Sequence, residues 1–148
     1  MTKPPVSRPD ATPDPARPPI APGLAGERTL IPDESHSARH LGSGGLGVFA
    51  TPAMIALMEG AAVAAIDPML PEGQASVGIA ISVRHLAATP LGQPVRARAE
   101  VTAVEGRQVT FSVQAWDAHE LIGEGTHTRF IIDVARYRAR LARKAAGG

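Results

Sequence analysis

The order of apolar and polar residues predicts one long apolar helix in the middle of the chain. Every residue from position 53 to position 66 is Ala, Met, Ile, Leu, Val or Gly, except Glu59. Thr51 and Pro52 form a strong helix start, because a threonine hydroxyl can cap free N–H groups and proline suits the first helical position. Pro68 is expected to end the helix. A helix without a polar face should be buried on most sides, so a sheet must curl around it.

Alternating apolar residues predict that sheet. Over residues 77–83 every second residue is apolar, which places His85 on the same face, and the same spacing recurs over residues 95–104 and 109–115. A last long strand is expected over residues 121–134. Short turns between these four strands predict three successive meander links.

The segment before the helix predicts less regular structure. Residues 30–32 suggest a strand that Pro32 ends, and residues 35–40 suggest a second extended piece. Together with the helix and the four later strands, this order predicts an α+β fold in which an antiparallel sheet wraps around one long apolar helix.

The two ends of the chain differ from the middle. Eight of the 14 prolines fall within residues 1–22, where large apolar residues are scarce, so a disordered Pro-rich tail is expected there rather than a PxxP ligand. The folded domain is predicted over residues 23–140. Residues 141–148 are predicted to form a basic tail. Five basic side chains fall within residues 134–148; a solvated segment is the simpler interpretation of this charge, and a phosphate-attracting patch is the alternative.

Composition narrows the class of protein. The 148 residues are 44% hydrophobic, which fits one domain, and 15 basic against 14 acidic side chains give no field that would attract nucleic acid. Cysteine is absent, which excludes a thiol nucleophile and cysteine zinc sites. The apolar stretches on either side of Glu59 are expected to be too short to span a bilayer, and no secretory signal is expected before them. A cytoplasmic protein without a membrane partner is predicted.

Glu59 is the first candidate for chemistry. A carboxylate in an otherwise apolar helix costs several kcal/mol to bury unless it is paired or neutralised, and such groups are common at functional sites. His85 is the natural partner, because it projects from the helix-facing side of its strand. A hydroxyl at Thr51, a carboxylate and an imidazole on one seam between helix and sheet would suit acyl transfer.

Other candidates carry weaker signals. The glycine-rich loop at residues 42–47 lacks the Gly-Lys-Ser/Thr of a phosphate-binding loop. His36 and His40 have a metal-ligand spacing only if their segment is helical, and no metal is expected. On the last strand, one face is small and polar, so it either lines a ligand channel or faces water; its residues are Leu121, Gly123, Gly125, His127 and Arg129.

Four short motifs, in order, resemble the hotdog-fold thioesterases of the fluoroacetyl-CoA thioesterase type. They are Val48-Phe49-Ala50-Thr51-Pro52-Ala53-Met54 with Ala56-Leu57-Met58-Glu59, Ser76-Val77-Gly78, Val83-Arg84-His85-Leu86-Ala87-Ala88-Thr89-Pro90, and Gly123-Glu124-Gly125-Thr126-His127-Thr128-Arg129-Phe130. The similarity covers about residues 23–140. It implies a hotdog fold, a homodimer whose sheets join edge to edge, and a site at the subunit interface that hydrolyses an acyl-CoA thioester.

The resemblance also implies residue roles. Thr51, Glu59 and His85 match the catalytic hydroxyl, carboxylate and histidine, and Gly78 and Arg129 match substrate-holding positions. Glu59 acts either as a base through Thr51 or water, or as a nucleophile that forms a mixed anhydride. No cofactor is implied, since CoA is part of the substrate. The fluoroacetyl-specific relative has an aromatic lid where this chain has its glycine-rich loop, so a short or medium acyl-CoA is the expected substrate.

Two other functions compete with hydrolysis. A non-catalytic acyl-CoA binding module would keep the fold and lose turnover, but the presence of all three polar residues favours the enzyme. Enoyl-CoA hydration would require an Asp-x-Asn-Pro-x-His segment, which the chain lacks.

Overall fold

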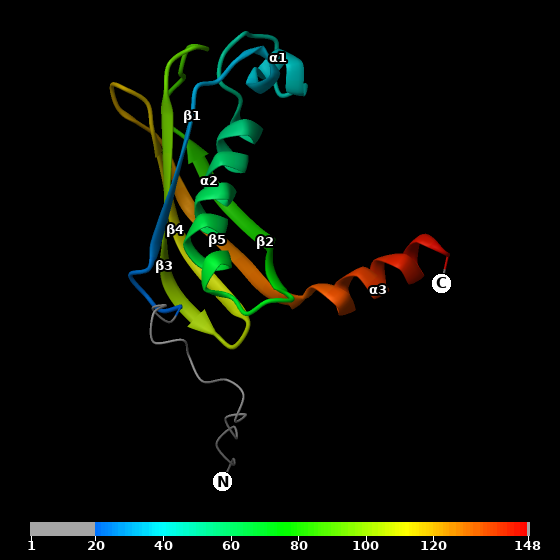
Figure 1. Ribbon diagram of the computed structural model, residues 1–148. Coiled ribbons are helices and arrows are strands. Elements are labelled where there is room, and N and C mark those ends of the chain that lie inside the picture. Colours follow the sequence, from blue (N-terminus) through cyan, green and yellow to red (C-terminus); the bar gives the residue numbers. More distant parts are fainter. Residues whose placement is uncertain (1–19, 148) are drawn as a thin grey trace.

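A five-stranded antiparallel sheet curves around one long helix in the computed structural model, which describes residues 20–147 (Figure 1). Along the sheet the strands lie in the order β1-β3-β4-β5-β2. The elements are β1 (Ala25–Leu30), η1 (Glu34–His36), α1 (Ala38–Leu41), α2 (Thr51–Ile66), η2 (Asp67–Met69), β2 (Gln74–His85), β3 (Val95–Glu105), β4 (Gln108–Trp116), β5 (Leu121–Asp133) and α3 (Val134–Ala145).

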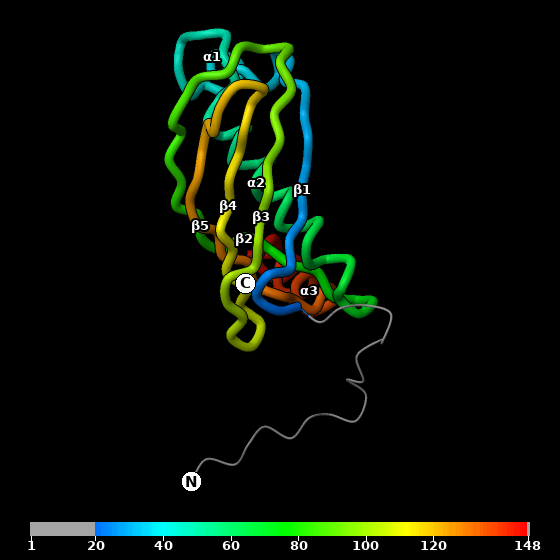
Figure 2. Tube along the Cα trace, turned by 90° about the vertical axis from the view of Figure 1, so that its left-hand side faces the viewer, coloured from blue at the N-terminus to red at the C-terminus, as the bar shows by residue number. Residues whose placement is uncertain are grey.

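The core lies between α2 and the concave face of the sheet. Figure 2 shows the strands side by side with α2 behind them. The side chains of α2 that face the sheet are buried, as are alternate residues of β3 and β4, which confirms the alternation expected there. At Gly26 an added Cβ would lie 2.5 Å from the backbone oxygen of Ala61 on α2. Glycine at this position therefore lets the backbone of β1 lie directly against the backbone of α2.

The apolar character of α2 extends into η2. The stretch Thr51–Met69 is long and apolar enough to cross a membrane by length and composition, contrary to the expectation that the apolar segments are too short. In the fold, α2 instead packs its apolar side chains against the sheet. Seven of the sixteen residues of α2 are buried within one chain, so the helix is less buried than its apolar sequence predicts.

The segment before α2 differs from the sequence prediction. Residues 35–40 form a turn of 3-10 helix and the short helix α1, not an extended piece, and β1 ends at Leu30. Asp33 and Ser37 cause the difference, because their side chains accept hydrogen bonds from the backbone N–H groups of Ser35 and His40. Side-chain caps of this kind start helices at any suitable Asp or Ser.

The sheet has two meander links rather than three. β2 does not form a hairpin with β3; it pairs with β5 at the edge of the sheet. Residues 86–94 carry the chain from this edge to the other side, and Thr89 anchors the crossing with a hydrogen bond to Asp117 at 2.9 Å. Local alternation predicts strands but not their partners, so the sequence could not distinguish these arrangements.

A bulge in β2 changes which residues share a face. The register with β5 shifts between Gly78 and Ala80, so the alternation predicted over residues 77–83 holds for Ile81 and Val83 and is wrong for Val77. Gly78 lies opposite Arg129, and His85 lies opposite Gly123. Because positions 123 and 129 of β5 share one face, the extra residue brings Gly78 and His85 to the same, helix-facing side.

The structure differs from the predicted domain boundaries at both ends of the domain. The predicted Pro-rich tail lies outside the described residues except for positions 20–22, and Ile20 already packs against the core. The basic segment forms helix α3, which Asp133 caps and which projects away from the sheet (Figure 1). The expected boundary at residue 140 therefore falls inside a helix, and β5 ends one residue before the predicted limit.

Candidate active site

Thr51 and His85 meet where α2 begins and β2 ends. The Thr51 Oγ1 atom lies 2.7 Å from Nδ1 of His85. The predicted helix cap is wrong in one respect: Ala50 occupies the cap position without a side-chain hydrogen bond, and Thr51 is the first helical residue. The hydroxyl is therefore free of a capping role and is hydrogen-bonded to the imidazole.

The environment of His85 favours the neutral imidazole. Burial lowers its pKa below 6.5, and the smaller contribution of the Ala87 backbone acts in the opposite direction. Its Nε2 atom is buried and has no hydrogen-bond partner among residues 20–147. A neutral imidazole next to a hydroxyl can accept a proton from that hydroxyl or from water, so the pair can serve as a base.

A cavity of about 410 Å³ opens beside this pair. Its wall combines Thr51 and His85 with Phe49, Leu46 and the backbone of the glycine-rich loop. Apolar walls with two convergent polar side chains are typical of small-molecule sites. The cavity can therefore hold an apolar group whose reactive end lies against the hydroxyl and the imidazole.

Glu59 belongs to a second cluster on the same helix. It follows Thr51 by eight residues, which places it about 12 Å further along the helix axis at 1.5 Å per residue. Its Oε2 atom lies 3.3 Å from Nη1 of Arg129. The prediction that Glu59 is buried next to His85 is wrong within one chain, because β2 is an outer strand and leaves the carboxylate 41% exposed.

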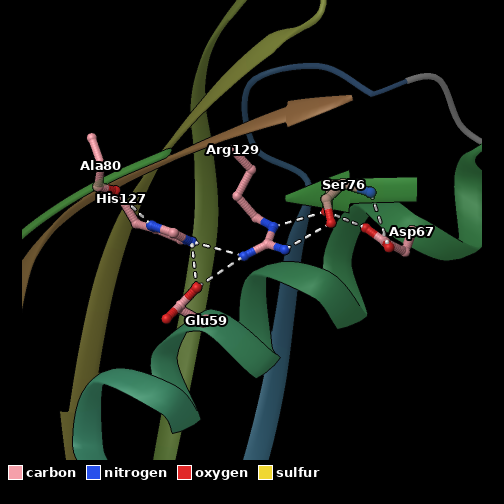
Figure 3. A network of polar contacts seen from close by, with 6 residues as sticks. All are labelled: Glu59, Asp67, Ser76, Ala80, His127 and Arg129. Carbon is pink, nitrogen blue, oxygen red and sulfur yellow. Dashed lines mark hydrogen bonds and ion pairs between the residues drawn. The ribbon is translucent and has the colours of Figure 1, made fainter. Parts of the chain in front are cut away.

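The guanidinium of Arg129 is buried and engaged on several sides (Figure 3). Its Nε donates to the Ser76 hydroxyl at 2.8 Å and its Nη2 to the Ser76 carbonyl at 2.9 Å. The Ser76 hydroxyl in turn donates to Asp67. These bonds fix Arg129 to β2. Its Nη1 then faces the Glu59 carboxylate and holds it from the β2 side.

His127, which was not among the predicted site residues, completes this cluster. Its Nδ1 lies 2.8 Å from the Ala80 carbonyl, which requires a proton on Nδ1, so Nε2 accepts from Nη1 of Arg129 at 3.2 Å. Burial, assisted by the Arg129 charge, lowers its pKa against the weaker effects of Ala80 and Glu59. The spacing of two from Arg129 was the available signal, since it places both on one strand face.

The small, polar face of β5 packs against neighbouring elements and does not face water. The residues from Gly123 to Arg129 on this face point toward α2 and β2, and His127 and Arg129 are buried. At Gly78 an added Cβ would lie 2.7 Å from Oε2 of Glu59 and 3.2 Å from Cε1 of His127. Glycine is therefore needed there to leave room for the carboxylate.

The structure thus divides the predicted residues into two groups. Thr51 and His85 lie together at the cavity, whereas Gly78, Arg129 and Glu59 lie together near a hollow of about 230 Å³ beside the edge strand β2. His36 is bound to Asp33, and within residues 20–147 no group of three or more acidic or histidine side chains is placed to hold a metal ion.

Comparisons with known proteins agree with this fold. Residues 32–135 match a family described as fluoroacetyl-CoA-specific thioesterase. The fluoroacetyl-CoA thioesterase of Streptantibioticus cattleyicolor is 45% identical over 101 residues, which cover 68% of this chain and 73% of that protein.

Two solved structures superpose well. A fluoroacetyl-CoA thioesterase superposes with a TM-score of 0.81 at 36% identity, over 86% of this chain and 98% of that one. A Thermus thermophilus protein described as a thioesterase superfamily member gives a TM-score of 0.80 at 30% identity, over 86% and 95%. These similarities confirm the predicted hotdog fold.

Proposed function

This chain belongs to the fluoroacetyl-CoA-specific thioesterase family and is an acyl-CoA thioesterase, and we propose that it hydrolyses short- or medium-chain acyl-CoA esters to the free acid and CoA. The observation that carries the proposal is the hydrogen-bonded pair of Thr51 and His85 beside an apolar cavity. The cavity wall contains glycines where an aromatic lid is expected in a fluoroacetyl-specific enzyme, so the acyl group need not be fluorinated. We propose a cytoplasmic enzyme that needs no cofactor.

In this mechanism water adds to the thioester carbonyl carbon, the C–S bond breaks, and the CoA thiolate takes up a proton. His85 moves the proton and Thr51 orients the water or relays its proton. Glu59 acts either as the base or as a nucleophile that first forms a mixed anhydride, which water then opens. Both routes require a carboxylate close to the Thr51–His85 pair.

A homodimer joined through β2 would provide that proximity. The edge of β2 is uncovered in the single chain, with Ile79 53% and Ile81 37% exposed. If two copies of β2 pair antiparallel across a two-fold axis, the His85 end of one strand lies opposite the Gln74 end of the other. Glu59 of the partner subunit would then approach the Thr51–His85 pair. The site is proposed to form between the two subunits.

The substitution Glu59→Gln tests the role of the carboxylate. A positioned base contributes about 10²- to 10⁴-fold, so kcat should fall by at least that much while the fold stays intact. The measurement is release of CoA from a panel of acyl-CoA esters, detected with a thiol-reactive dye. Glu72→Gln, at an exposed loop position, is the control. A near-normal rate for Glu59→Gln would remove this residue from the mechanism, and binding without any CoA release by wild type would favour the binding module.

Mixed dimers test whether the site is shared. Co-expressed Glu59→Gln and His85→Gln chains are each inactive alone, but a mixed dimer retains one site with both native residues if each site uses both subunits. With random mixing, activity should recover to about a quarter of the wild-type value. If every site lies within one chain, mixing restores no activity.

A further inference from the structure

The ring of His127 is held in one place on the helix-facing side of β5. It stacks on Phe111 of β4, with the ring centroids 6.0 Å apart and an angle of 26° between the planes. Its Nδ1 donates to the carbonyl of Ala80, the first paired residue of β2 after the bulge, at 2.8 Å. On a third side, a Cβ added at Gly78 would lie 3.2 Å from Cε1 of the ring. These contacts with both neighbouring strands fix the position of the Nε2 atom.

The Nε2 atom of His127 faces the guanidinium of Arg129. Because Nδ1 carries the proton of the neutral ring, Nε2 is an acceptor without a hydrogen. It accepts from Nη1 of Arg129 at 3.2 Å and lies 4.0 Å from Oε2 of Glu59 (Figure 3). A ring nitrogen without a hydrogen cannot donate to the carboxylate. The influence of His127 on Glu59 therefore passes through Arg129.

The guanidinium of Arg129 is held from two sides. Its Nη1 carries two N–H groups, which suffice for both acceptors, Oε2 of Glu59 and Nε2 of His127. Its other nitrogens donate to the hydroxyl and the carbonyl of Ser76. The group cannot tilt without leaving a buried donor unpaired, which is costly. Since Arg129 is buried and Glu59 is 41% exposed, the carboxylate takes its position from the guanidinium rather than the reverse.

We propose that His127 is a positioning residue for Glu59, an inference that rests on the proposed function. By accepting a hydrogen bond from Nη1, His127 fixes the plane of the Arg129 guanidinium, and the guanidinium holds the carboxylate where the reaction needs it. This role requires no contact between His127 and the acyl group or the thioester. Loss of the hydrogen bond should therefore lower kcat and leave KM unchanged.

Asparagine and glutamine at position 127 separate the roles of the two ring nitrogens. The asparagine amide ends near the place of Nδ1, so His127→Asn can donate to the Ala80 carbonyl but offers Arg129 no acceptor. The glutamine amide reaches the place of Nε2, so His127→Gln keeps an acceptor for Arg129 and loses the bond to Ala80. His119→Asn and His119→Gln, at an exposed turn, are the matched controls.

Release of CoA from the ester that wild type hydrolyses fastest gives kcat and KM for wild type and the variants. His127→Asn should lower kcat about tenfold or more at an unchanged KM, because catalysis is sensitive to displacements near 1 Å. His127→Gln should keep most of the wild-type kcat although it unfolds at a lower temperature. The controls should match wild type. A near-normal kcat for His127→Asn, or equal losses of kcat in both variants at position 127, would overturn the proposal.

Two structural measurements do not depend on turnover. Nitrogen NMR of wild type should find the His127 proton on Nδ1; a proton on Nε2 would set two donors against each other and overturn the proposal. Crystal structures should show the Glu59 carboxylate displaced from Arg129 in His127→Asn and in place in His127→Gln. An unmoved carboxylate in both would contradict the positioning role. Because wild-type CoA release alone tests the proposed function, failure of that function and failure of the positioning role are distinguishable.

Discussion

The absence of one side chain at Gly78 decides where the Glu59 carboxylate lies. An added methyl group would approach three groups at once, and all three are the ends of side chains: Glu59, His127 and Arg129. Such ends can move without displacing the backbone, so the conflict should change the position of the carboxylate and leave the fold intact. Gly78 differs in this respect from glycines whose added Cβ would meet backbone atoms.

Gly78→Ala is therefore expected to lower kcat about tenfold or more, because catalysis is sensitive to displacements near 1 Å, with little change in thermal stability. Gly125→Ala is the contrast, since its Cβ would lie 2.1 Å from the backbone oxygen of Ser82. That variant should lose about 1–3 kcal/mol or more of unfolding free energy. Kinetics and thermal unfolding of both variants check the distinction. Normal activity of Gly78→Ala would show that the carboxylate position is not critical.

Arg129 shows how contacts can refine a role inferred from resemblance. The resemblance implies that it holds the substrate, whereas its guanidinium here is buried and bound to Ser76, His127 and Glu59. These contacts favour a positioning role for Glu59.

Arg129→Lys separates the two roles, because lysine keeps the charge but cannot reproduce the planar fork. If Arg129 positions Glu59, kcat should fall about tenfold or more with little change in KM. A higher KM with an unchanged kcat would instead support the substrate-holding role. Arg84→Lys, at an exposed position of β2, serves as the control.

The buried histidines predict how stability depends on pH. Burial lowers the pKa of His85 and His127 below 6.5 in the folded chain, while the unfolded chain keeps ordinary values. Below about pH 6.5 the unfolded chain therefore binds more protons, and the free energy of unfolding falls as the pH decreases toward the folded-state values.

Denaturant unfolding between pH 7.5 and 5.5 measures this loss. His127→Gln cannot titrate, so its stability should depend less steeply on pH than that of wild type. His119→Gln, at an exposed turn, should keep the wild-type slope. Parallel slopes for wild type and His127→Gln would mean that His127 does not contribute to the loss.

At the level of elements, the sequence predicts what is local. The apolar run of α2 and the alternation of β3 and β4 were sufficient for the α+β class, because each pattern requires burial of one surface. The sequence supported the hypothesis that Thr51 and His85 meet on one seam between helix and sheet, and the two side chains are hydrogen-bonded there. The alternation of β2 was misleading before the bulge, since the extra residue turns Val77 away from the helix while Ile81, Val83 and His85 keep the predicted face.

Pairing across the sheet could not be predicted in this way. The β2–β5 contact joins segments about fifty residues apart, and nothing in either strand identifies the other. The partner of Glu59 was missed for this reason, because Arg129 reaches the carboxylate only when β5 lies between β4 and β2. The resemblance supplied Arg129 as a candidate site residue, and the strand order explains why it lies beside Glu59.

At the level of the whole molecule, the uncovered edge of β2 bears on activity. Exposed edge strands pair readily with other strands, and lysine on such an edge opposes pairing. Ile81 is 37% exposed on β2, and Val104 is equally exposed on β3, away from this edge. Lysine at Ile81 and lysine at Val104 therefore make the same apolar-to-charged change, one on the β2 edge and one away from it.

Ile81→Lys is expected to yield a monomer by light scattering and to lose most activity, because in the proposed dimer each site draws residues from both subunits. Val104→Lys should remain a dimer with near-normal turnover. A fully active monomer of Ile81→Lys would contradict the shared site, and a wild type that is monomeric at assay concentrations would contradict the β2 interface.

Two glycines of the loop over residues 42–47, Gly44 and Gly45, line the Thr51 cavity, and this restricts how its selectivity can change. Gly45 lines it, has an unstrained backbone, and would meet no atom within 4 Å if it carried a Cβ. Replacement at such a position can only add bulk, so variation there narrows the entrance and cannot widen it. If the acyl preference is as broad as proposed, single mutations at Gly45 should therefore shift it toward smaller acyl groups at little cost in stability.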